Sequence, residues 1–222
     1  MNITCISDTH GYHETLKEKL HGGDMIIHAG DCSHFGSLEA NIAFLKWFNE
    51  LPYRFKIMVA GNHDFAFQLK SKEFQSSLKN TEVIYLEDSY VTLDGFTVFG
   101  SPWTVGNNGW AFEQFFEYKI EEIYASTIPS NQKLDIIVSH APLKGYMDVT
   151  KRQGNTGPVE IHYGTDAMLG LVEKKKPRLV VFGHVHNQYG KSVMENGTTL
   201  VNASIFKGTK MPLNDPIIID LK

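Results

Sequence analysis

Short apolar runs bounded by glycine, serine or other polar residues recur along the chain. Five of them lead within a few residues into carboxylate, imidazole or amide side chains: residues 3–6, 25–27, 56–60, 135–138 and 178–182. Mostly apolar runs rich in β-branched residues are typical of strands that are covered on both faces. The pattern therefore predicts buried strands with polar side chains at their ends.

Apolar residues recur at helical spacing between several of these runs. Ser37 is suited to cap a helix in which apolar positions from Ala40 to Leu51 repeat every three or four residues. Four more helices are expected over residues 13–20, 65–78, 112–124 and 165–175. Alternation of strands and helices along a chain is typical of α/β proteins.

Turn signals predict further strands. Asp94-Gly95 and Asn196-Gly197 are typical of tight hairpin turns. They join predicted strands at residues 90–93 with 96–100 and at 191–195 with 198–203, and single strands are expected at 83–86 and, as a sheet edge, at 216–221. Residues 141–163 show little periodicity and many Gly, Pro and polar residues, so we expect a long loop that overhangs the functional site and selects the substrate.

The pattern predicts an α/β sandwich, although periodicity alone does not distinguish one doubly wound sheet from two stacked sheets. The chain has 222 residues, of which 42% are hydrophobic, enough to bury a substantial core. The candidate ligands described below run from Asp8 to His186, so a cut through the middle would leave neither half with a complete site. We therefore expect residues 1–222 to form a single domain.

Charge and hydropathy narrow the class of protein. The net charge of −4 gives no basic footprint for a dedicated nucleic-acid binder, and the basic run at residues 174–176 is typical of a helix C-terminus before Pro177. No apolar run approaches the roughly 18 residues of a membrane span, and no leader precedes the first strand. Cys5 and Cys32, the only cysteines, favour reduced thiols, and a disulfide between them is the alternative. We expect a cytoplasmic protein without membrane contact, whose oligomeric state stays open.

Five polar motifs supply the candidate chemistry, at residues 7–10, 30–31, 61–64, 139–140 and 183–186. Two divalent ions about 3.5–4 Å apart need a shared carboxylate, terminal ligands on each side and an open face for substrate. Loops that follow parallel strands converge at one edge of a sheet, so motifs distant in sequence can meet there. Asp31 is the candidate for the shared ligand.

The histidines differ in how strongly they indicate a ligand. Alternation in an extended segment places His184 and His186 on one face, and His140 adds a third imidazole, so together they favour a metal site. His140 alone would be an ordinary buried polar residue. The remaining histidines with no matching ligand role are interpreted as surface or hydrogen-bonded residues, with His28 a candidate for buried support of the site: His13, His21, His28 and His162.

The ordered series of these motifs resembles that of the calcineurin-like metallophosphoesterases over nearly the whole chain. The series is Asp8-x-His10, Gly30-Asp31, Gly61-Asn62-His63-Asp64, His140 and Gly183-His184-Val185-His186. Further pieces resemble the small metallophosphoesterase-domain phosphodiesterases: Gly100-Ser101-Pro102-Trp103, Tyr189-Gly190 and the segment 198–204. The resemblance implies a four-layer α-β-β-α sandwich, with two mixed sheets flanked by helices.

The resemblance also implies the ligands of two divalent ions. One ion would be bound by Asp8, His10, Asp31 and His186, and the other by Asp31, Asn62, His140 and His184. Mixed oxygen and imidazole donors suit Mn, Fe or Zn better than Ca. The implied reaction is in-line attack on phosphorus by a hydroxide held between the ions, with His63 as the catalytic group that protonates the leaving oxygen or stabilises phosphoryl charge. Asp64 is expected to support the turn and is not counted as a ligand.

One departure from the family bears on the substrate. In the protein phosphatases of this superfamily, Asp and Arg follow the shared Asp at three and four residues, but His34 and Phe35 stand there in this sequence. The guanidinium that suits a dianionic monoester is therefore missing from its expected place. Arg152 in the 141–163 segment either substitutes for it or is a solvated surface charge.

These observations favour a metal-dependent phosphodiesterase that acts on a small nucleotide-like or cyclic nucleotide diester. A phosphomonoesterase and a nuclease are the enzyme alternatives, and the acidic charge disfavours the nuclease. A protein-binding scaffold with a vestigial metal site, like the retromer subunit of this fold, is disfavoured because every expected ligand and His63 are present.

Two further groups of residues have more than one interpretation. Four aromatic residues in or beside irregular stretches could stack on a nucleobase or pack in the core: Trp103, Trp110, Phe112 and Tyr146. Asn202 and Ser204 are candidates for support of the loop that carries His184 and His186.

Overall fold

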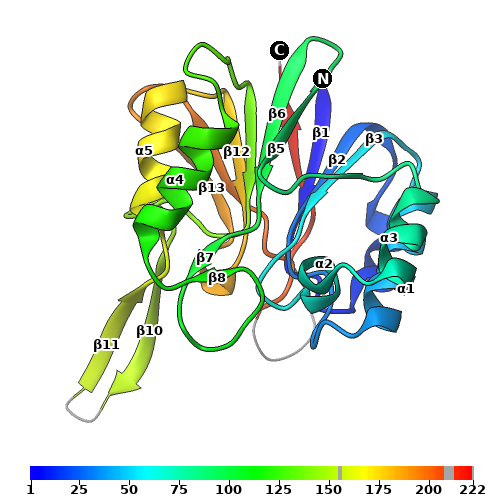
Figure 1. The fold of residues 1–222 in the computed structure, drawn as a ribbon, viewed down its shortest axis with the longest axis horizontal. Helices are drawn as coiled ribbons and strands as arrows, with labels where there is room; N and C mark the ends of the chain where they lie inside the picture. The colour runs from blue at the N-terminus through cyan, green and yellow to red at the C-terminus, as the bar shows by residue number, and fades with distance from the viewer. Residues whose placement is uncertain (155–156, 208–212, 222) are drawn as a thin grey trace.

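Two mixed β-sheets lie face to face at the centre of the computed structural model, which describes residues 1–154, 157–207 and 213–221 (Figure 1). The first sheet has the order β15-β1-β2-β3-β4. Its strands are β1 (Asn2–Ile6), β2 (Gly23–Ala29), β3 (Tyr53–Val59), β4 (Ile84–Tyr85) and β15 (Ile217–Asp220). Strands β1 to β4 are parallel, and β15 pairs antiparallel with β1, which confirms the edge strand predicted at residues 216–221.

The second sheet has the order β13-β14-β12-β9-β6-β5. Its strands are β5 (Ser89–Leu93), β6 (Phe96–Ser101), β9 (Ile136–Ser139), β12 (Leu179–Phe182), β13 (Gly190–Val193) and β14 (Thr199–Asn202). The four inner strands are parallel, and the two edge strands are antiparallel to their neighbours. Both predicted hairpins are present, and Asp94 and Gly95 have the positive φ angles, 48° and 83°, that a tight hairpin turn requires.

Alternation of side chains along each strand divides the core into layers. Ile3 and Cys5 of β1 face the second sheet and pack in one cluster with Val138 and Val181 of that sheet. Ile6 points to the opposite face of the first sheet and packs with its helices. Apolar residues of both sheets therefore share one inner cluster between them.

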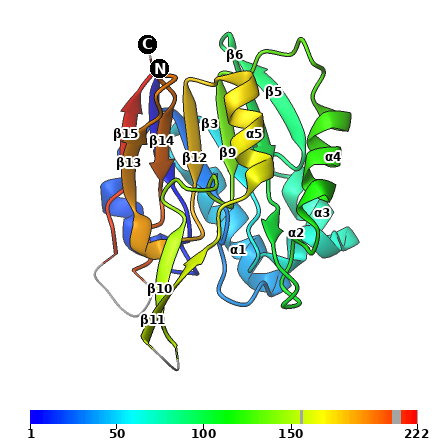
Figure 2. The same cartoon turned by 90° about the vertical axis from the view of Figure 1, so that its left-hand side faces the viewer.

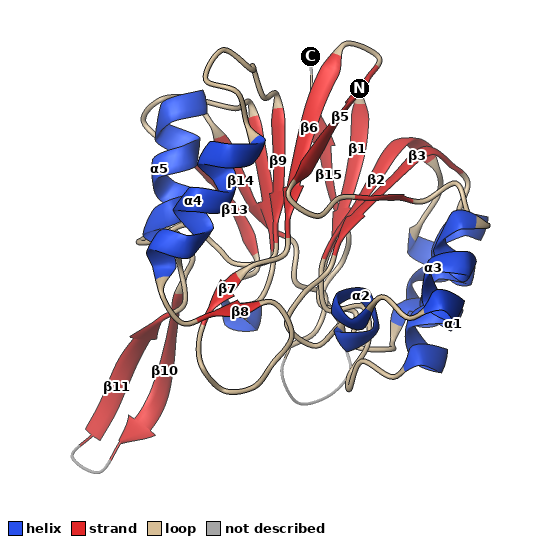
Figure 3. Ribbon diagram, viewed as in Figure 1, coloured by secondary structure: helices blue, strands red, loops and turns tan. Residues whose placement is uncertain are grey.

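Helices cover the outer face of each sheet (Figures 1 and 3). The helices α1 (Leu38–Glu50), α2 (Phe65–Leu69) and α3 (Lys72–Lys79) cover the first sheet, and α4 (Glu117–Thr127) and α5 (Asp166–Lys175) cover the second. The short 3-10 helices are η1 (His13–Lys19) and η2 (His186–Gln188). The predicted cap of α1 is confirmed, because the Ser37 side chain accepts a hydrogen bond from the Ala40 N–H. The molecule is the four-layer sandwich that the resemblance implied.

Two predicted helices have different limits. The helix expected over 65–78 is split, because Lys70 takes a left-handed conformation with φ of 49° and Ser71 caps the second part. The helix expected over 112–124 begins only at α4, since Phe112 has a φ of 50° and the next residues form β8 (Glu113–Gln114), which pairs with β7 (Thr104–Val105). Apolar spacing alone did not reveal these breaks.

The segment expected to be irregular contains a β-hairpin. Strands β10 (Val149–Gly154) and β11 (Gly157–His162) pair antiparallel and project from the body of the molecule (Figures 1 and 2). Residues 155–156 lie outside the described residues. The prediction of a loop was wrong here because a hairpin that buries neither face leaves no apolar alternation in its sequence.

The described parts of the chain contain no helix with the length and apolar character needed to span a membrane. Cys5 and Cys32 are both buried and free, as expected of reduced thiols. Burial raises the pKa of each thiol well above its usual range, so neither is a thiolate at neutral pH.

Replacing glycine by alanine should have opposite effects at a buried and at an exposed position. A Cβ atom at Gly100 of β6 would overlap Leu86 and lie 2.8 Å from Val59 Cγ1, so G100A should reduce the free energy of unfolding by about 1–3 kcal/mol. Gly170 of α5 is exposed with open space around its Cα, so G170A should raise stability by about 0.5–1 kcal/mol. Urea unfolding of both variants measures this, and a neutral G100A would contradict the tight inter-sheet contact.

Candidate metal centre

The seven predicted ligands lie just beyond the carboxyl ends of five parallel strands. Strands β1, β2 and β3 of the first sheet lead to four of them, and β9 and β12 of the second sheet lead to three. The described chain termini lie at the opposite end of the sheets (Figure 1). The stacking of the two sheets therefore brings loops up to 178 residues apart in sequence to one place.

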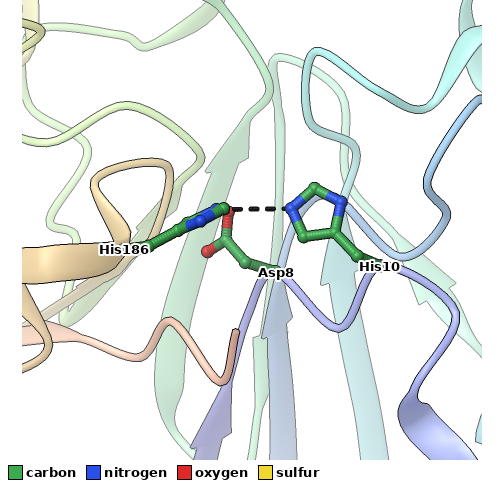
Figure 4. Close-up of side chains that lie close together, drawn as sticks. All are labelled: Asp8, His10 and His186. Atoms are coloured by element: carbon green, nitrogen blue, oxygen red, sulfur yellow. Dashed lines mark hydrogen bonds and ion pairs between the residues drawn. The ribbon is translucent and has the colours of Figure 1, made fainter. Parts of the chain in front are cut away.

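The first group of donors consists of Asp8, His10 and His186 (Figure 4). Their donor atoms all lie within 4.8 Å of one another. The Nε2 atoms of His10 and His186 face each other at 3.3 Å, and His186 Nε2 lies 3.2 Å from Asp8 Oδ1. Asp31 Oδ2 approaches the same group, at 3.7 Å from His10 Nε2.

The second group consists of Asp31, His140 and His184, with Asn62 beside them. His140 Nε2 lies 3.4 Å from Asp31 Oδ2, 3.2 Å from His184 Nδ1 and 3.0 Å from Asn62 Oδ1. Asp31 Oδ2 therefore faces both groups of donors. The structure brings together all seven residues that the sequence nominated, and their role as ligands stays a prediction.

The spacing and chemistry of these donors fit divalent metal ions. Two donors at about 2.0–2.2 Å from one tetrahedral or octahedral ion lie about 3–3.5 Å apart. The distances of 3.0–3.4 Å around His140 Nε2 match that spacing. The Nε2 atoms of His10 and His186, 3.3 Å apart, are close enough to bind one shared cation. The geometry therefore fits two adjacent ions with Asp31 between them.

Hydrogen bonds at the far side of two imidazoles fix which nitrogen faces the centre. His140 Nδ1 lies 2.9 Å from Ala29 O and donates its proton there, so Nε2 is the ring nitrogen that faces the centre and can bind a cation once it gives up its proton. His63 Nδ1 donates to His34 O at 2.7 Å, so its Nε2 is directed to Asp31 Oδ2, 4.0 Å away. The backbone N–H of His63 donates to Asp31 Oδ1 at 2.8 Å and orients the other carboxylate oxygen toward both donor groups.

Burial and mutual attraction shift the acid–base behaviour of the group. Burial alone would lower the pKa of His140, but the Asp31 carboxylate raises it to about 9. Burial and the His140 charge lower the pKa of His184 to about 3. Burial would raise the pKa of Asp8, but a hydrogen bond and attraction from His186 hold it well below its usual range. The centre thus offers two ionised carboxylates to a cation, and an ion bound there replaces protons.

Backbone strain is concentrated at these residues. Asp8, His10, Asp31 and His184 have positive φ angles of 52°, 42°, 57° and 68°, and they are four of the ten described non-glycine residues in this region. Such conformations cost about 1–3 kcal/mol each and persist only where the surrounding structure imposes them. The strain indicates that these side chains are held for a purpose other than stability.

The glycines of the motifs allow the backbone to approach the donors. A Cβ atom at Gly61 would overlap Asp31 Oδ1 and lie 2.7 Å from His140 Cε1. A Cβ atom at Gly183 would overlap the carboxylate of Asp8. Close approach of the backbone explains why glycine precedes the ligands in these motifs.

Asp8 is held by several donors. Its Oδ2 accepts hydrogen bonds from Ser204 Oγ at 2.8 Å and from the His184 N–H at 3.1 Å. Asn202 Nδ2 donates to Val185 O at 2.9 Å, between the two histidines of that loop. Asn202 and Ser204 thus make the supporting contacts that were expected of them.

Asp64 and His28 connect the ligand loops. Asp64 accepts hydrogen bonds from the N–H groups of Gly61 and Cys32 at 2.9 and 3.1 Å, which matches the supporting role expected of it. Burial, reinforced by the Asp31 charge, raises its pKa to about 6. His28 is fully buried, accepts from the Gly30 N–H at 3.2 Å, and donates from Nε2 to Thr9 Oγ1 at 3.0 Å. The interpretation of His28 as buried support is consistent with these bonds.

His13 does not fit its expected description as a surface or hydrogen-bonded residue. It is buried against Phe44 and Trp47, and its Nδ1 has no hydrogen-bond partner in the described structure. Burial lowers its pKa, so it behaves as a neutral aromatic residue. The apolar residues around it come from α1, and no pattern in the sequence indicates that contact.

The four aromatic candidates separate into core and site residues. Phe112 is buried, Tyr146 packs against the helices of the second sheet, and Trp103 is half-buried with its indole N–H donating to Asp88. Only Trp110 of these four contacts a predicted site residue, with its ring 4.4 Å from that of His63. Trp110 is therefore the aromatic candidate that the structure places beside the centre.

Phe206 contacts the centre but was not among the candidates. Its ring lies 5.3 Å from that of His10 and 5.5 Å from that of His186, and it stacks on Tyr12. The sequence offered one signal for this contact. Phe206 comes two residues after Ser204, and the predicted strand at 198–203 was already expected to end near the site.

The base of the 141–163 segment also reaches the centre. Gln188, the last residue of η2, donates from Nε2 to Val149 O at 2.9 Å. The same short helix begins with His186. The ring of Tyr163 packs edge-on against His184 at 5.3 Å. Arg152 lies farther along β10 with an exposed side chain, as expected of a solvated charge.

Comparison with known proteins adds independent findings. The family described as calcineurin-like phosphoesterase matches residues 1–188. Human metallophosphoesterase domain-containing protein 1 is 37% identical over an alignment 245 residues long, gaps included. The alignment covers 99% of this chain and 70% of that protein. UPF0046 protein K07C11.7 of Caenorhabditis elegans is 32% identical over 92% of this chain and 69% of its own length. The crystal structure of TT1561 of Thermus thermophilus is 16% identical, covers 90% of this chain and 88% of its own, and has a TM-score of 0.59, which indicates a shared fold.

The shared position of Asp31 predicts how metal content responds to substitution. Protein reconstituted with Mn should bind two ions per chain, D31A should lose most of both, and H10A should lose mainly one, because only Asp31 faces both donor groups. Elemental analysis after removal of free metal measures this. Asp24 lies at the exposed start of β2, the strand that leads to Asp31. D24A is therefore the control and should keep both ions. One ion per chain at saturation, or two ions in D31A, would contradict the dinuclear arrangement.

Proposed function

Because the chain belongs to the calcineurin-like phosphoesterase family of metal-dependent phosphoric ester hydrolases, we propose that it is a dinuclear phosphodiesterase acting on a small nucleotide-like or cyclic nucleotide diester. The observation that carries the proposal is the position of Asp31 Oδ2 between two groups of metal donors, with His63 beside it. The 222 residues act as one domain in this proposal.

The donor groups define two ion sites. Asp8, His10, Asp31 and His186 would hold one divalent ion, and Asp31, Asn62, His140 and His184 would hold the other. Mn, Fe or Zn suits these oxygen and imidazole donors. When bound, such ions lower the pKa of water and draw charge from phosphoryl oxygens. The ligand residues fix where such ions would lie relative to His63, whose Nε2 is 4.0 Å from Asp31 Oδ2.

His63 is suited to act on the leaving group. Its Nδ1 proton is committed to His34 O, which fixes the ring, while Nε2 faces the centre and the side chain is 21% exposed. In its protonated form the Nε2–H can donate to the oxygen that leaves phosphorus. An imidazole held in this way also stabilises the negative charge that develops on that oxygen. His63 and Asp31 are therefore the proposed catalytic residues.

The surroundings of Asp31 favour a diester over a phosphoprotein. Phe35 occupies the position where an arginine would clamp a dianionic monoester, and its side chain is 76% exposed. Arg152 is exposed on the projecting hairpin. A diester carries one negative charge, so two metal ions and His63 suffice for it. The base of the 141–163 segment lies beside η2 and His184, which supports a role in substrate selection.

The two buried free thiols support a reducing compartment, and we take the cytoplasm as the proposed location. The net charge of −4 supports a small substrate rather than a nucleic acid. A vestigial scaffold role has less support, because the structure brings the full predicted ligand set and His63 together.

Replacing His63 tests its role as the proton donor. H63A should keep near-normal metal content but lose about 10²–10⁴-fold in turnover, because a positioned general acid contributes that much. The loss should shrink when the leaving group needs no protonation, so rates on nitrophenyl and alkyl diesters are compared. H21A, which removes an exposed imidazole, is the control and should retain full activity. An equal loss on both esters would assign His63 to charge stabilisation instead.

A substrate panel tests the preference for diesters. With one metal and one buffer, specificity constants are measured for bis-nitrophenyl phosphate, nitrophenyl phosphate, cyclic nucleotides and a phosphopeptide. Diesters should be hydrolysed faster than monoesters because no guanidinium faces the centre from position 35. A phosphopeptide that outperforms every diester would refute the proposed substrate class.

A further inference from the structure

Trp110 exposes a large aromatic surface next to the proposed catalytic histidine. Its side chain is 38% exposed, and its ring lies 4.4 Å from the His63 ring with an angle of 35° between the planes. Phe65 packs at 6.2 Å from the same indole. One part of the indole is thus fixed by neighbours, and another part stays open beside His63.

The loop that carries Trp110 is fixed relative to the metal ligands. The Ala111 N–H donates to the backbone carbonyl of Asn62 at 3.0 Å. The Glu113 carboxylate accepts from the N–H groups of Trp110 and Asn108, at 3.1 and 2.7 Å. The residues that follow Trp110, Ala111 and Phe112, are buried in the core. The exposed indole is therefore held in register with the centre and not at the tip of a free loop.

Two other aromatic residues near the centre contact the imidazoles of proposed ligands. Phe206 packs against His10 and His186 and stacks on Tyr12, with 9° between their planes. Tyr163 meets His184 edge-on. Trp110 combines an exposed ring with close contact to the group expected to protonate the leaving oxygen, at 4.4 Å, whereas the exposed His34 ring is farther from it, at 6.2 Å.

We propose that Trp110 is a stacking platform for a planar aromatic group, such as a nucleobase, on the leaving-group side of the substrate. The inference rests on the proposed phosphodiesterase function. A group that donates a proton to the leaving oxygen lies within about 3 Å of it. The substituent on that oxygen then occupies the space beside His63, where the indole lies. Stacking on one aromatic residue favours a base-bearing ligand by about tenfold or more.

The test compares two strained cyclic diesters that differ in the base. Adenosine 2′,3′-cyclic phosphate carries it, and the abasic 1,4-anhydroribitol 2,3-cyclic phosphate does not. Manganese-loaded wild type should have a specificity constant about tenfold or more higher for the nucleotide. W110L should reduce that preference to within about twofold by losing rate on the nucleotide alone, and W110F should keep most of it.

Phe115 provides a matched control. It lies on the same stretch of chain and is 60% exposed, but its ring packs against that of Phe116, at 4.6 Å, and not against His63. F115L should keep the wild-type preference. Metal content and melting temperature of all variants are measured, so that loss of folding is recognised. If F115L lost the preference as W110L does, the apolar surface in general would be responsible and the proposal would be wrong.

A binding measurement makes the inference independent of turnover. Adenosine monophosphate should quench tryptophan fluorescence of the wild type, ribose 5-phosphate should not, and W110L should lose the quenching. Equal rate losses on both diesters in W110L would show that Trp110 only positions His63, which overturns the proposal. A wild type that hydrolyses both diesters equally well also overturns it but leaves the phosphodiesterase function intact. If the wild type hydrolyses no diester, the phosphodiesterase function is refuted. If adenosine monophosphate then also fails to quench the fluorescence, the stacking role of Trp110 is refuted as well.

Discussion

The arrangement of the molecule depends on how one buried carboxylate is neutralised. Asp31 is 2% exposed, and a carboxylate removed from water is costly unless donors or cations surround it. One of its oxygens accepts the His63 N–H, and the other faces His10 from the first sheet and His140 from the second. These contacts exist only if strand ends of both sheets meet at one point. The stacking of the sheets and the donor groups of the proposed metal centre are therefore parts of one constraint.

The core between the sheets maintains the strain at that point. Asp8 and Asp31 hold left-handed backbone conformations, and the chain passes their carboxylates closely at Gly183 and Gly61. Such conformations are unfavourable for residues other than glycine, so apolar packing of the strands behind them has to impose them. Rigidity of the inter-sheet core and affinity for metal are linked in this way, and a substitution far from any ligand can weaken the centre by loosening the strands that lead to it.

The features that could be predicted from the sequence are those decided by neighbouring residues in the chain. Ser37, the two hairpin turns and the strands that precede the ligands are of this kind, and the motif series resembled a known family closely enough to imply the four layers. The break at Lys70, the short strand after Phe112 and the hairpin that begins at Val149 could not be predicted, because each is decided by tertiary contacts or by exposure on both faces. The ligand set could be nominated because the ordered motifs resembled those of a known family, whereas the contact of Phe206 with two imidazoles depends on how a distant segment returns to β1.

The bond between Ser204 and Asp8 has a consequence for how the protein is made. Asp8 is synthesised before its partners, because His186 and Ser204 follow it 178 and 196 residues later in the chain. A nascent chain offers only scattered carboxylates and imidazoles, and scattered donors bind divalent ions far more weakly than a preformed set. The support of Asp8 by Ser204 can form only after β14, which pairs with β12 and precedes Ser204, has been made. Chains that stop before residue 204 therefore lack the hydrogen bond that holds Asp8 in place beside the other donors.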